Sequence, residues 1–262
     1  MSARFPLARV LLVCPHPVDE TLGAGLLLQE VVARGGQVRV LYLTDGERNP
    51  IPQLLEERRW PFGPAARARW GARRRAEARE ALRILGVEDG AAEHWSLPDQ
   101  GLAHLADGDR VVASLSAAFE SFAPTVIVTP SARDLHPDHV AAASLVRRAM
   151  AKSGQDIAHL VYRVHGGRPS LDDAYVPPAS LPTLNRKSEA MNAHATQLVA
   201  SRRRMLHLAT RPEALWSWET DIRHGAQSWR GLRRLMHLLP IWTASKAEWD
   251  EGTVASVPLE ES

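Results

Sequence analysis

The sequence contains a single cysteine, Cys14, which excludes a disulfide within the chain and suits a reducing compartment. It has no run approaching the roughly 20 apolar residues that a membrane-spanning helix needs. The apolar run at residues 10–14 ends at Pro15 and lacks the small-residue cleavage site of a secretory signal. The formal net charge of +2 is too small to indicate a nucleic-acid-binding protein. We therefore expect a cytoplasmic protein that neither crosses a membrane nor binds nucleic acid.

What is present is typical of an α/β domain. The chain has 262 residues, of which 45% are hydrophobic and 24% charged, as in globular proteins. Apolar, β-branched runs predict buried strands at residues 8–14, 37–44, 91–97, 125–129 and 157–164. Helical periodicity predicts helices at residues 20–34, 64–85, 108–122 and 138–152. This alternation predicts a mainly parallel sheet covered by helices.

Two short polar turns each follow one of these predicted strands. His16 and Asp19 come directly after the first strand, and His136 and His139 follow the strand at 125–129. Open α/β sheets bind their ligands at the carboxyl ends of the strands, so both turns belong to the same edge of the sheet. Two imidazoles and one carboxylate are typical ligands of a catalytic zinc ion. We predict that His16, Asp19 and His139 bind one divalent metal, while His136 stabilises the oxyanion or protonates the leaving amine.

The same turns resemble a known family. Pro15-His16-Pro17-Val18-Asp19-Glu20 resembles the Pro-His-Pro-Asp-Asp-Glu signature of the PIG-L/LmbE zinc-dependent N-deacetylases, and His136-Pro137-Asp138-His139 is similar to their second signature. The resemblance covers residues 8–200. It implies a three-layer α/β/α Rossmann-like fold with a mainly parallel sheet and a bound Zn²⁺ or another divalent metal. The implied activity is hydrolysis of an N-acetyl or other N-acyl group on an amino sugar, such as N-acetylglucosamine, or on its conjugate.

Weaker similarities extend the match. Arg74 lies in a segment similar to the family's Arg-x-x-Glu helix, and Asp99 in one similar to its Pro-Asp-Gly loop, which implies that both bind the sugar. The alternatives are a surface salt bridge for Arg74 and an ordinary turn for Asp99. His194 lies in a segment that resembles the closing helix of the family, where it either faces the site or packs.

Val18 departs from the family pattern. It stands where the family has an aspartate that takes the proton from the attacking water, and valine can neither accept nor donate a proton. Three explanations stay open: an engineered substitution, a natural enzyme that uses Glu20, Asp45 or Asp134 instead, or a decayed enzyme that only binds metal and sugar. A nucleotide-binding protein of Rossmann type is disfavoured, because the first turn lacks the Gly-x-Gly-x-x-Gly pattern.

The chain is expected to divide near residue 200. Residues 1–200 form the predicted deacetylase-like domain, and residues 201–262 form a basic extension with several tryptophans that packs on the same domain. The alternative for this extension is a surface for a polyanionic or lipid-linked partner or for another copy of the chain. The sequence leaves open whether the chain forms a homo-oligomer, and which sugar and acyl group it recognises.

Overall fold

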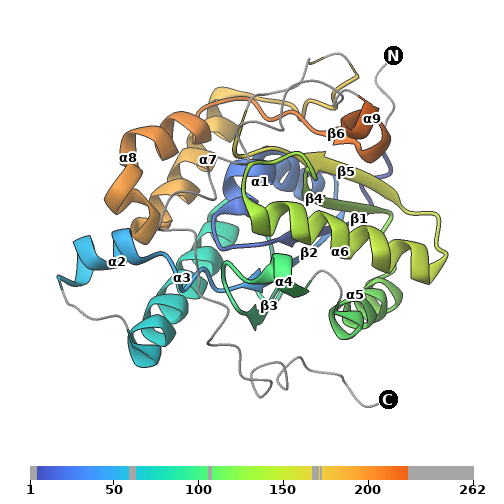
Figure 1. Ribbon diagram of the computed structural model, residues 1–262. Coiled ribbons are helices and arrows are strands. Elements are labelled where there is room, and N and C mark those ends of the chain that lie inside the picture. The colour runs from blue at the N-terminus through green and yellow to red at the C-terminus, as the bar shows by residue number, and fades with distance from the viewer. Residues whose placement is uncertain (1–4, 59–62, 106–107, 167–170, 172, 224–262) are drawn as a thin grey trace.

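A six-stranded sheet forms the centre of the molecule (Figure 1). The computed structural model describes residues 5–58, 63–105, 108–166, 171 and 173–223. The strands follow the order β3-β2-β1-β4-β5-β6, in which β6 alone is antiparallel to its neighbour. Their bounds are β1 Arg9–Cys14, β2 Gln37–Thr44, β3 Ala92–Leu97, β4 Val126–Pro130, β5 Ala158–Tyr162 and β6 Trp216–Ser217.

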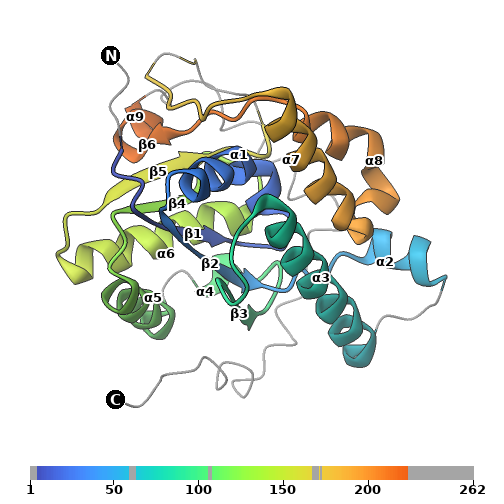
Figure 2. The same ribbon diagram turned by 180° about the vertical axis from the view of Figure 1, so that it is seen from behind.

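Helices cover both faces of this sheet, so the predicted α/β/α architecture is confirmed (Figure 1 and Figure 2). One layer contains α1 (Asp19–Ala33), α3 (Pro64–Leu85) and α7 (Leu181–Ala193). The other contains α5 (Asp109–Phe122) and α6 (Pro137–Ser153). The remaining helices are α2 (Pro50–Glu57), α4 (Leu102–Leu105), α8 (Ala195–Ala209) and α9 (Trp218–Arg223). Within the described residues, no helix has the length and apolarity needed to cross a membrane.

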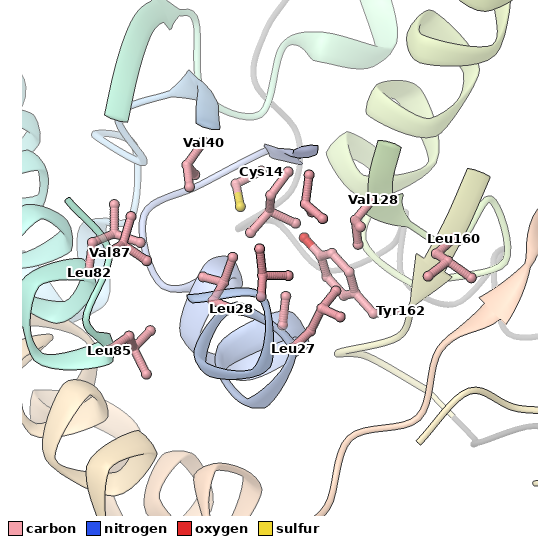
Figure 3. Packing of buried hydrophobic residues seen from close by; sticks show 14 of the residues in the cluster. Cys14, Leu27, Leu28, Val40, Leu82, Leu85, Val87, Val128, Leu160 and Tyr162 are labelled. Atoms are coloured by element: carbon pink, nitrogen blue, oxygen red, sulfur yellow. The ribbon is translucent and has the colours of Figure 1, made fainter. Parts of the chain in front are cut away.

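The alternation of side chains along β1 explains the two layers of core. Leu12 and Cys14 face α1 and α3, whereas Leu11 and Val13 face α5 and α6, and all four are fully buried. Successive residues of a strand point to opposite faces, so a continuously apolar strand must be covered on both sides. Figure 3 shows the first of these cores, in which apolar side chains of the sheet and the flanking helices meet. Cys14 is one of them and is buried.

Some elements differ from the sequence-based expectation. Residues 50–57, for which no element was predicted, form α2, with Pro50 in the first turn. The predicted closing helix is divided at His194 into α7 and α8. Residues 201–223 of the expected extension form the end of α8, β6 and α9, so part of this segment belongs to the central sheet. Trp229, Trp242 and Trp249 lie outside the described residues, and the division near residue 200 stays a prediction.

Candidate active site

The strand order creates a crevice at the carboxyl ends of β1 and β4. The chain leaves β1 toward β2 and β3 on one side and returns to add β4 and β5 on the other. Such a reversal separates the connections that follow the two central strands, and ligands of open α/β sheets bind there. His16 follows β1, and His136 follows β4, so the fold brings these two turns together. Their ring centroids are 4.7 Å apart.

Asp19 bridges the two histidines that were predicted to share a metal with it. Its Oδ2 lies 3.3 Å from Nδ1 of His16, and its Oδ1 lies 3.4 Å from Nε2 of His139. The backbone N–H of His16 also donates to Oδ2 of Asp19 at 2.9 Å, which fixes the turn. All three residues are buried. The structure therefore places the three predicted ligands in direct contact.

The donor atoms at this position suit a divalent metal. His16, His136 and His139 each offer a ring nitrogen, and these atoms lie within 4.8 Å of one another. Asp19 contacts two of these three histidines, His16 and His139, through a different oxygen for each. His139 is fully buried, and neither of its ring nitrogens has a hydrogen-bond partner among the described residues. A buried imidazole nitrogen without a hydrogen bond, beside a carboxylate, is available to bind a zinc ion.

Carboxylates determine the charge state of the cluster. Burial alone would lower the pKa of His139, but the carboxylates of Asp19 and Asp134 outweigh it and raise this pKa to about 9. Burial would raise the pKa of Asp19, but His139 and His16 hold it well below its usual value. The site therefore keeps Asp19 ionised, as a metal ligand must be.

His136 is held in one orientation by the start of α6. Its Nδ1 accepts a hydrogen bond of 3.2 Å from the backbone N–H of Asp138, which caps the helix. Burial and the charges of His16 and His139 lower the pKa of His136 well below its usual value. A neutral ring that accepts at Nδ1 carries its proton on Nε2. His136 is thus a neutral donor at the site rather than an imidazolium ion.

Asp134 and Asp138 contact the histidines but do not line the pocket. Asp134 accepts from the backbone N–H of His136 at 2.9 Å and lies 3.3 Å from Nδ1 of His139. Asp138 lies 3.2 Å from Nε2 of His16 and accepts from the backbone N–H of Gln100 at 2.7 Å. Such outer carboxylates orient metal-binding imidazoles and fix their tautomers.

Arg74 and Asp99, the predicted sugar-binding residues, both lie at the cluster. Arg74 is buried, and its Nη1 and Nη2 donate to the carbonyls of Gly46 and Pro17 at 2.6 and 2.7 Å. Position 46 requires glycine, since a Cβ there would lie 1.9 Å from Nη1 of Arg74. Oδ1 of Asp99 lies 3.2 Å from Nε2 of His16, and its Oδ2 accepts from the backbone N–H of Arg48 at 2.8 Å. Each residue thus holds the loops around the site, and sugar binding by Arg74 and Asp99 stays a prediction.

A pocket of about 230 Å³ opens onto these groups. His16, Asp19, Arg74, Asp99 and His136 all line it. The other lining residues are Val18, Leu22, Asn49, Pro50, Ile51, Gln100, Val164, His165, Gln197 and Met205. A pocket that joins apolar walls to a few converging polar groups is the usual form of a small-molecule site.

His165 is a functional candidate that the sequence analysis missed. It follows β5, the neighbour of β4, and its ring centroid is 5.2 Å from that of His139. Its backbone N–H donates to Asp134 at 3.0 Å. His165 follows a predicted strand, as His16 does, and this position could have indicated a site residue. Unlike His16, however, His165 has no carboxylate beside it in the same turn.

None of the three carboxylates that were considered as replacements for the missing base lines the pocket. Both oxygens of Glu20 are engaged, one by the backbone N–H of Val18 at 2.8 Å and the other by His194 and Thr21, both at 2.6 Å. Asp45 pairs with Arg75. Asp134 contacts His136 and His139, as described above. His194 packs against Glu20 and is fully buried, so it holds the start of α1.

Comparison with known proteins agrees with this arrangement. The model of the PIG-L family, described as GlcNAc-PI de-N-acetylase, matches residues 11–150, a range that includes both histidine turns. The chain belongs to the PIG-L family. This assignment confirms the resemblance seen in the sequence.

The individual relatives include deacetylases. A 1D-myo-inositol 2-acetamido-2-deoxy-alpha-D-glucopyranoside deacetylase from Mycolicibacterium vanbaalenii is 34% identical over 172 residues, which are 60% of this chain and 59% of that protein. The chain thus matches less than two thirds of the length of this relative. The structure of the zinc-inhibited form of teicoplanin deacetylase Orf2 has a TM-score of 0.62 at 19% identity and covers 80% of this chain and 97% of that one.

The fold alone does not determine the reaction. The 4-carboxy-2-hydroxymuconate hydratase GalB of Pseudomonas putida has a TM-score of 0.58 at 20% identity and covers 78% of this chain and 83% of that one. One scaffold therefore carries both deacetylase and hydratase activities, and the function must be argued from the site.

Proposed function

We propose that this PIG-L family protein is a metal-dependent amidohydrolase that removes an N-acetyl or other N-acyl group from an amino sugar or its conjugate. The observation that carries the proposal is the contact of Asp19 with both His16 and His139 at the pocket. The names of the curated relatives support the substrate class, because they describe deacetylases of 2-acetamido sugars.

His16, Asp19 and His139 would hold the metal, for which Zn²⁺ or another divalent ion fits the donor set. The chemistry that such an ion supplies when bound is that of a Lewis acid toward an amide carbonyl. The ionised state of Asp19 and the outer carboxylates of Asp134 and Asp138 prepare the site for a cation.

His136 stabilises the developing negative charge in this proposal. Its Nε2–H donates to the carbonyl oxygen as the carbonyl carbon becomes tetrahedral, and this donor is preoriented by the bond from Asp138 to Nδ1. The acyl carbon becomes tetrahedral as the oxygen of a water molecule bonds to it, and one proton of that water passes to the nitrogen as the C–N bond breaks. The products are a carboxylic acid and a free amine, and the acid then gives its proton to the amine to leave a carboxylate and an ammonium group on the sugar. Arg74 and Asp99 position the sugar at the pocket.

A metal- and sugar-binding protein that has lost turnover is the second candidate. Val18 is the observation that favours it, because no ionisable side chain occupies the position of the family's base. Loss of a general base costs about 10²–10⁴-fold in rate, whereas metal and ligand binding do not depend on it. Turnover of this sequence is therefore expected to be slow under the first candidate and absent under the second.

Metal content and amine release test both candidates. We expect about one divalent ion per chain in the wild type and in Asp109→Asn, a control at an exposed carboxylate. In Asp19→Asn, the affinity should fall by more than the roughly 10–100-fold that loss of an outer partner costs. Amine release is then measured with a panel of N-acetylated amino sugars. A wild type that takes up no divalent ion contradicts both candidates, and metal binding without any amine release favours the second.

A further inference from the structure

One wall of the pocket is apolar, and this wall begins at Val18. Val18 and Leu22 line the pocket from the start of α1, and Val164 and Met205 line it from the end of β5 and from α8. All four belong to one hydrophobic cluster, so they form a continuous surface. We call these four side chains the apolar wall. The wall has further apolar residues behind it: Met191, Leu198 and Ala209.

The apolar lining continues outward along α2. Pro50 and Ile51 at the start of α2 line the same pocket, and Ile51 keeps 49% of its surface exposed. Leu54 and Leu55 follow on the same helix and are 37% and 53% exposed. Exposed apolar side chains on α2 thus continue beyond Ile51, which itself lines the pocket.

Other residues of the pocket lining are polar or charged. Asn49, Arg74, Asp99 and Gln100 present amide, guanidinium and carboxylate groups to the pocket. An N-acyl amino sugar has the same division, because its sugar ring carries hydroxyl groups and its acyl chain carries only methyl and methylene groups. The reacting amide bond joins these two parts.

The position of Val18 decides which part of the substrate the apolar wall meets. Val18 lines the same pocket as His16 and Asp19, the residues beside which the proposed function places the reacting carbonyl carbon. The substituent nearest to that carbon is the acyl chain. A carboxylate at position 18 would be desolvated by Leu22 and the rest of the cluster, whereas valine fits it.

From these observations we propose that Val18 and the apolar wall form a subsite for an acyl chain longer than acetyl, such as an aliphatic chain of about four to eight carbons. The inference rests on the proposed function and names its substrate class. Each methylene group that the wall covers should tighten binding about fourfold, up to the length that the wall and α2 accommodate. An acetyl group contacts only a small part of this surface.

The test compares N-acyl glucosamines of increasing chain length. Dissociation constants of the metal-loaded protein for N-acetyl-, N-butyryl-, N-hexanoyl- and N-octanoylglucosamine are measured by calorimetry, alongside kcat/KM for amine release. We expect the dissociation constant to fall at least tenfold from acetyl to hexanoyl, with kcat/KM rising in parallel. Because binding is measured separately, slow turnover does not prevent the comparison.

A matched pair of variants locates the effect. Met205→Gln places an amide in the apolar wall, whereas Leu206→Gln changes the next residue, which belongs to the same cluster but does not line the pocket. The preference for hexanoyl over acetyl should fall at least fivefold in Met205→Gln and stay within twofold of the wild type in Leu206→Gln. Equal losses in the two variants would overturn the assignment of the wall.

Other outcomes separate this inference from the proposed function. Binding and amine release that are greatest for the acetyl compound and decrease with chain length would overturn the acyl subsite and leave the deacetylase proposal intact. Tighter binding of octyl β-glucoside than of N-octanoylglucosamine would show that the wall takes an aglycone, which also overturns the inference. Failure to bind any of the four N-acyl compounds would contradict both proposals.

Discussion

Val18 has a backbone conformation that valine rarely adopts. Its φ of 117° and ψ of −24° lie outside the regions favoured by β-branched residues. Several contacts hold it there: its N–H donates to Glu20, its carbonyl accepts from Thr21 and Leu22, and Arg74 holds the carbonyl of Pro17. Such strain persists only where the surroundings determine the conformation, and it concentrates at functional sites.

A carboxylate introduced at position 18 should provide the general base that valine cannot supply. We expect Val18→Asp to raise kcat for N-acetylglucosamine by about 100-fold or more, since general-base catalysis contributes about 10²–10⁴-fold. Val18→Asn is the control, because asparagine has the same shape and tolerates a positive φ but accepts no proton at neutral pH. Rates are measured as amine release at saturating metal. Equal rates in the two variants would show that position 18 does not supply the base.

Arg74 is expected to act on stability as well as on the substrate. Arg74→Lys should lower the free energy of unfolding by about 3 kcal/mol, because one ammonium cannot replace two charge-assisted bonds to the carbonyls of Gly46 and Pro17. Arg73→Lys, a change at an exposed neighbour on the same helix, should cost less than about 1 kcal/mol. Urea unfolding measures both. A cost for Arg74→Lys as small as that for Arg73→Lys would contradict the structural role.

At the residue level, the sequence predicted which side chains meet but not how they are oriented. His16, Asp19, His136 and His139 lie where the chain leaves β1 and β4 and enters α1 and α6, so the strand order brings them together. Their roles as ligands stay a prediction. The bond that Asp138 makes to Nδ1 of His136 depends on helix capping, which the sequence pattern does not specify.

At the level of elements, the long periodic segments were predictable and the short ones were not. The helix predicted at 64–85 is α3, and the strands at 8–14, 37–44 and 125–129 correspond to β1, β2 and β4. By contrast, β6 has only two residues, and its pairing with β5 comes from tertiary contacts. Local patterns are reliable where an element buries a whole face and uninformative where a few residues pair at an edge.

The contact between β5 and α9 should make the stability of the protein sensitive to acid. The ring of His159 in β5 bonds to Thr129 at 2.9 Å and stacks on Trp218 of α9 with centroids 5.1 Å apart. Burial, together with the charge of Arg147, lowers the pKa of His159 to about 3. The folded protein therefore keeps this ring neutral, while the unfolded chain binds a proton below pH about 6.5. Stability must fall as the pH falls from this value toward 3.

The effect is measured by urea unfolding at pH 7 and pH 5. For one histidine with these two pKa values, the loss of unfolding free energy at pH 5 is about 2 kcal/mol. His159→Gln should remove this part of the pH dependence, and His207→Gln, at an exposed position of α8, should keep it. The same pH dependence in His159→Gln and the wild type would contradict the argument.

At the scale of the whole molecule, a buried ion pair joins the C-terminal part of the described chain to the helix that begins at the site. Glu213, which precedes β6, accepts from the backbone N–H groups of Leu26 and Leu27 in α1 at 2.7 and 3.1 Å. Lys187 of α7 lies 2.6 Å from the same carboxylate and donates to the carbonyl of Leu22 at 3.3 Å. Residues distant in sequence thus hold α1, which carries Asp19, in place.

Removal of Glu213 should destabilise the whole fold. We expect Glu213→Ala to lower the free energy of unfolding by about 3–5 kcal/mol, because it leaves the charge of Lys187 buried without its partner. Glu189→Ala, at an exposed position of α7, is the control and should cost less than about 1 kcal/mol. Urea unfolding at pH 7 gives both values. A small cost for Glu213→Ala would show that the pair does not stabilise the contact between α1 and the C-terminal part.

The burial of Cys14 has a practical consequence for following the protein in solution. Burial raises the pKa of its thiol well above the usual value, and the side chain is inaccessible in the core. Because the sequence has no other cysteine, the native chain should take up neither maleimide nor nitroxide reagents while folded. A cysteine introduced at the exposed Leu55 would be the single labelling position, and its spectrum would report directly whether acyl chains displace water from α2.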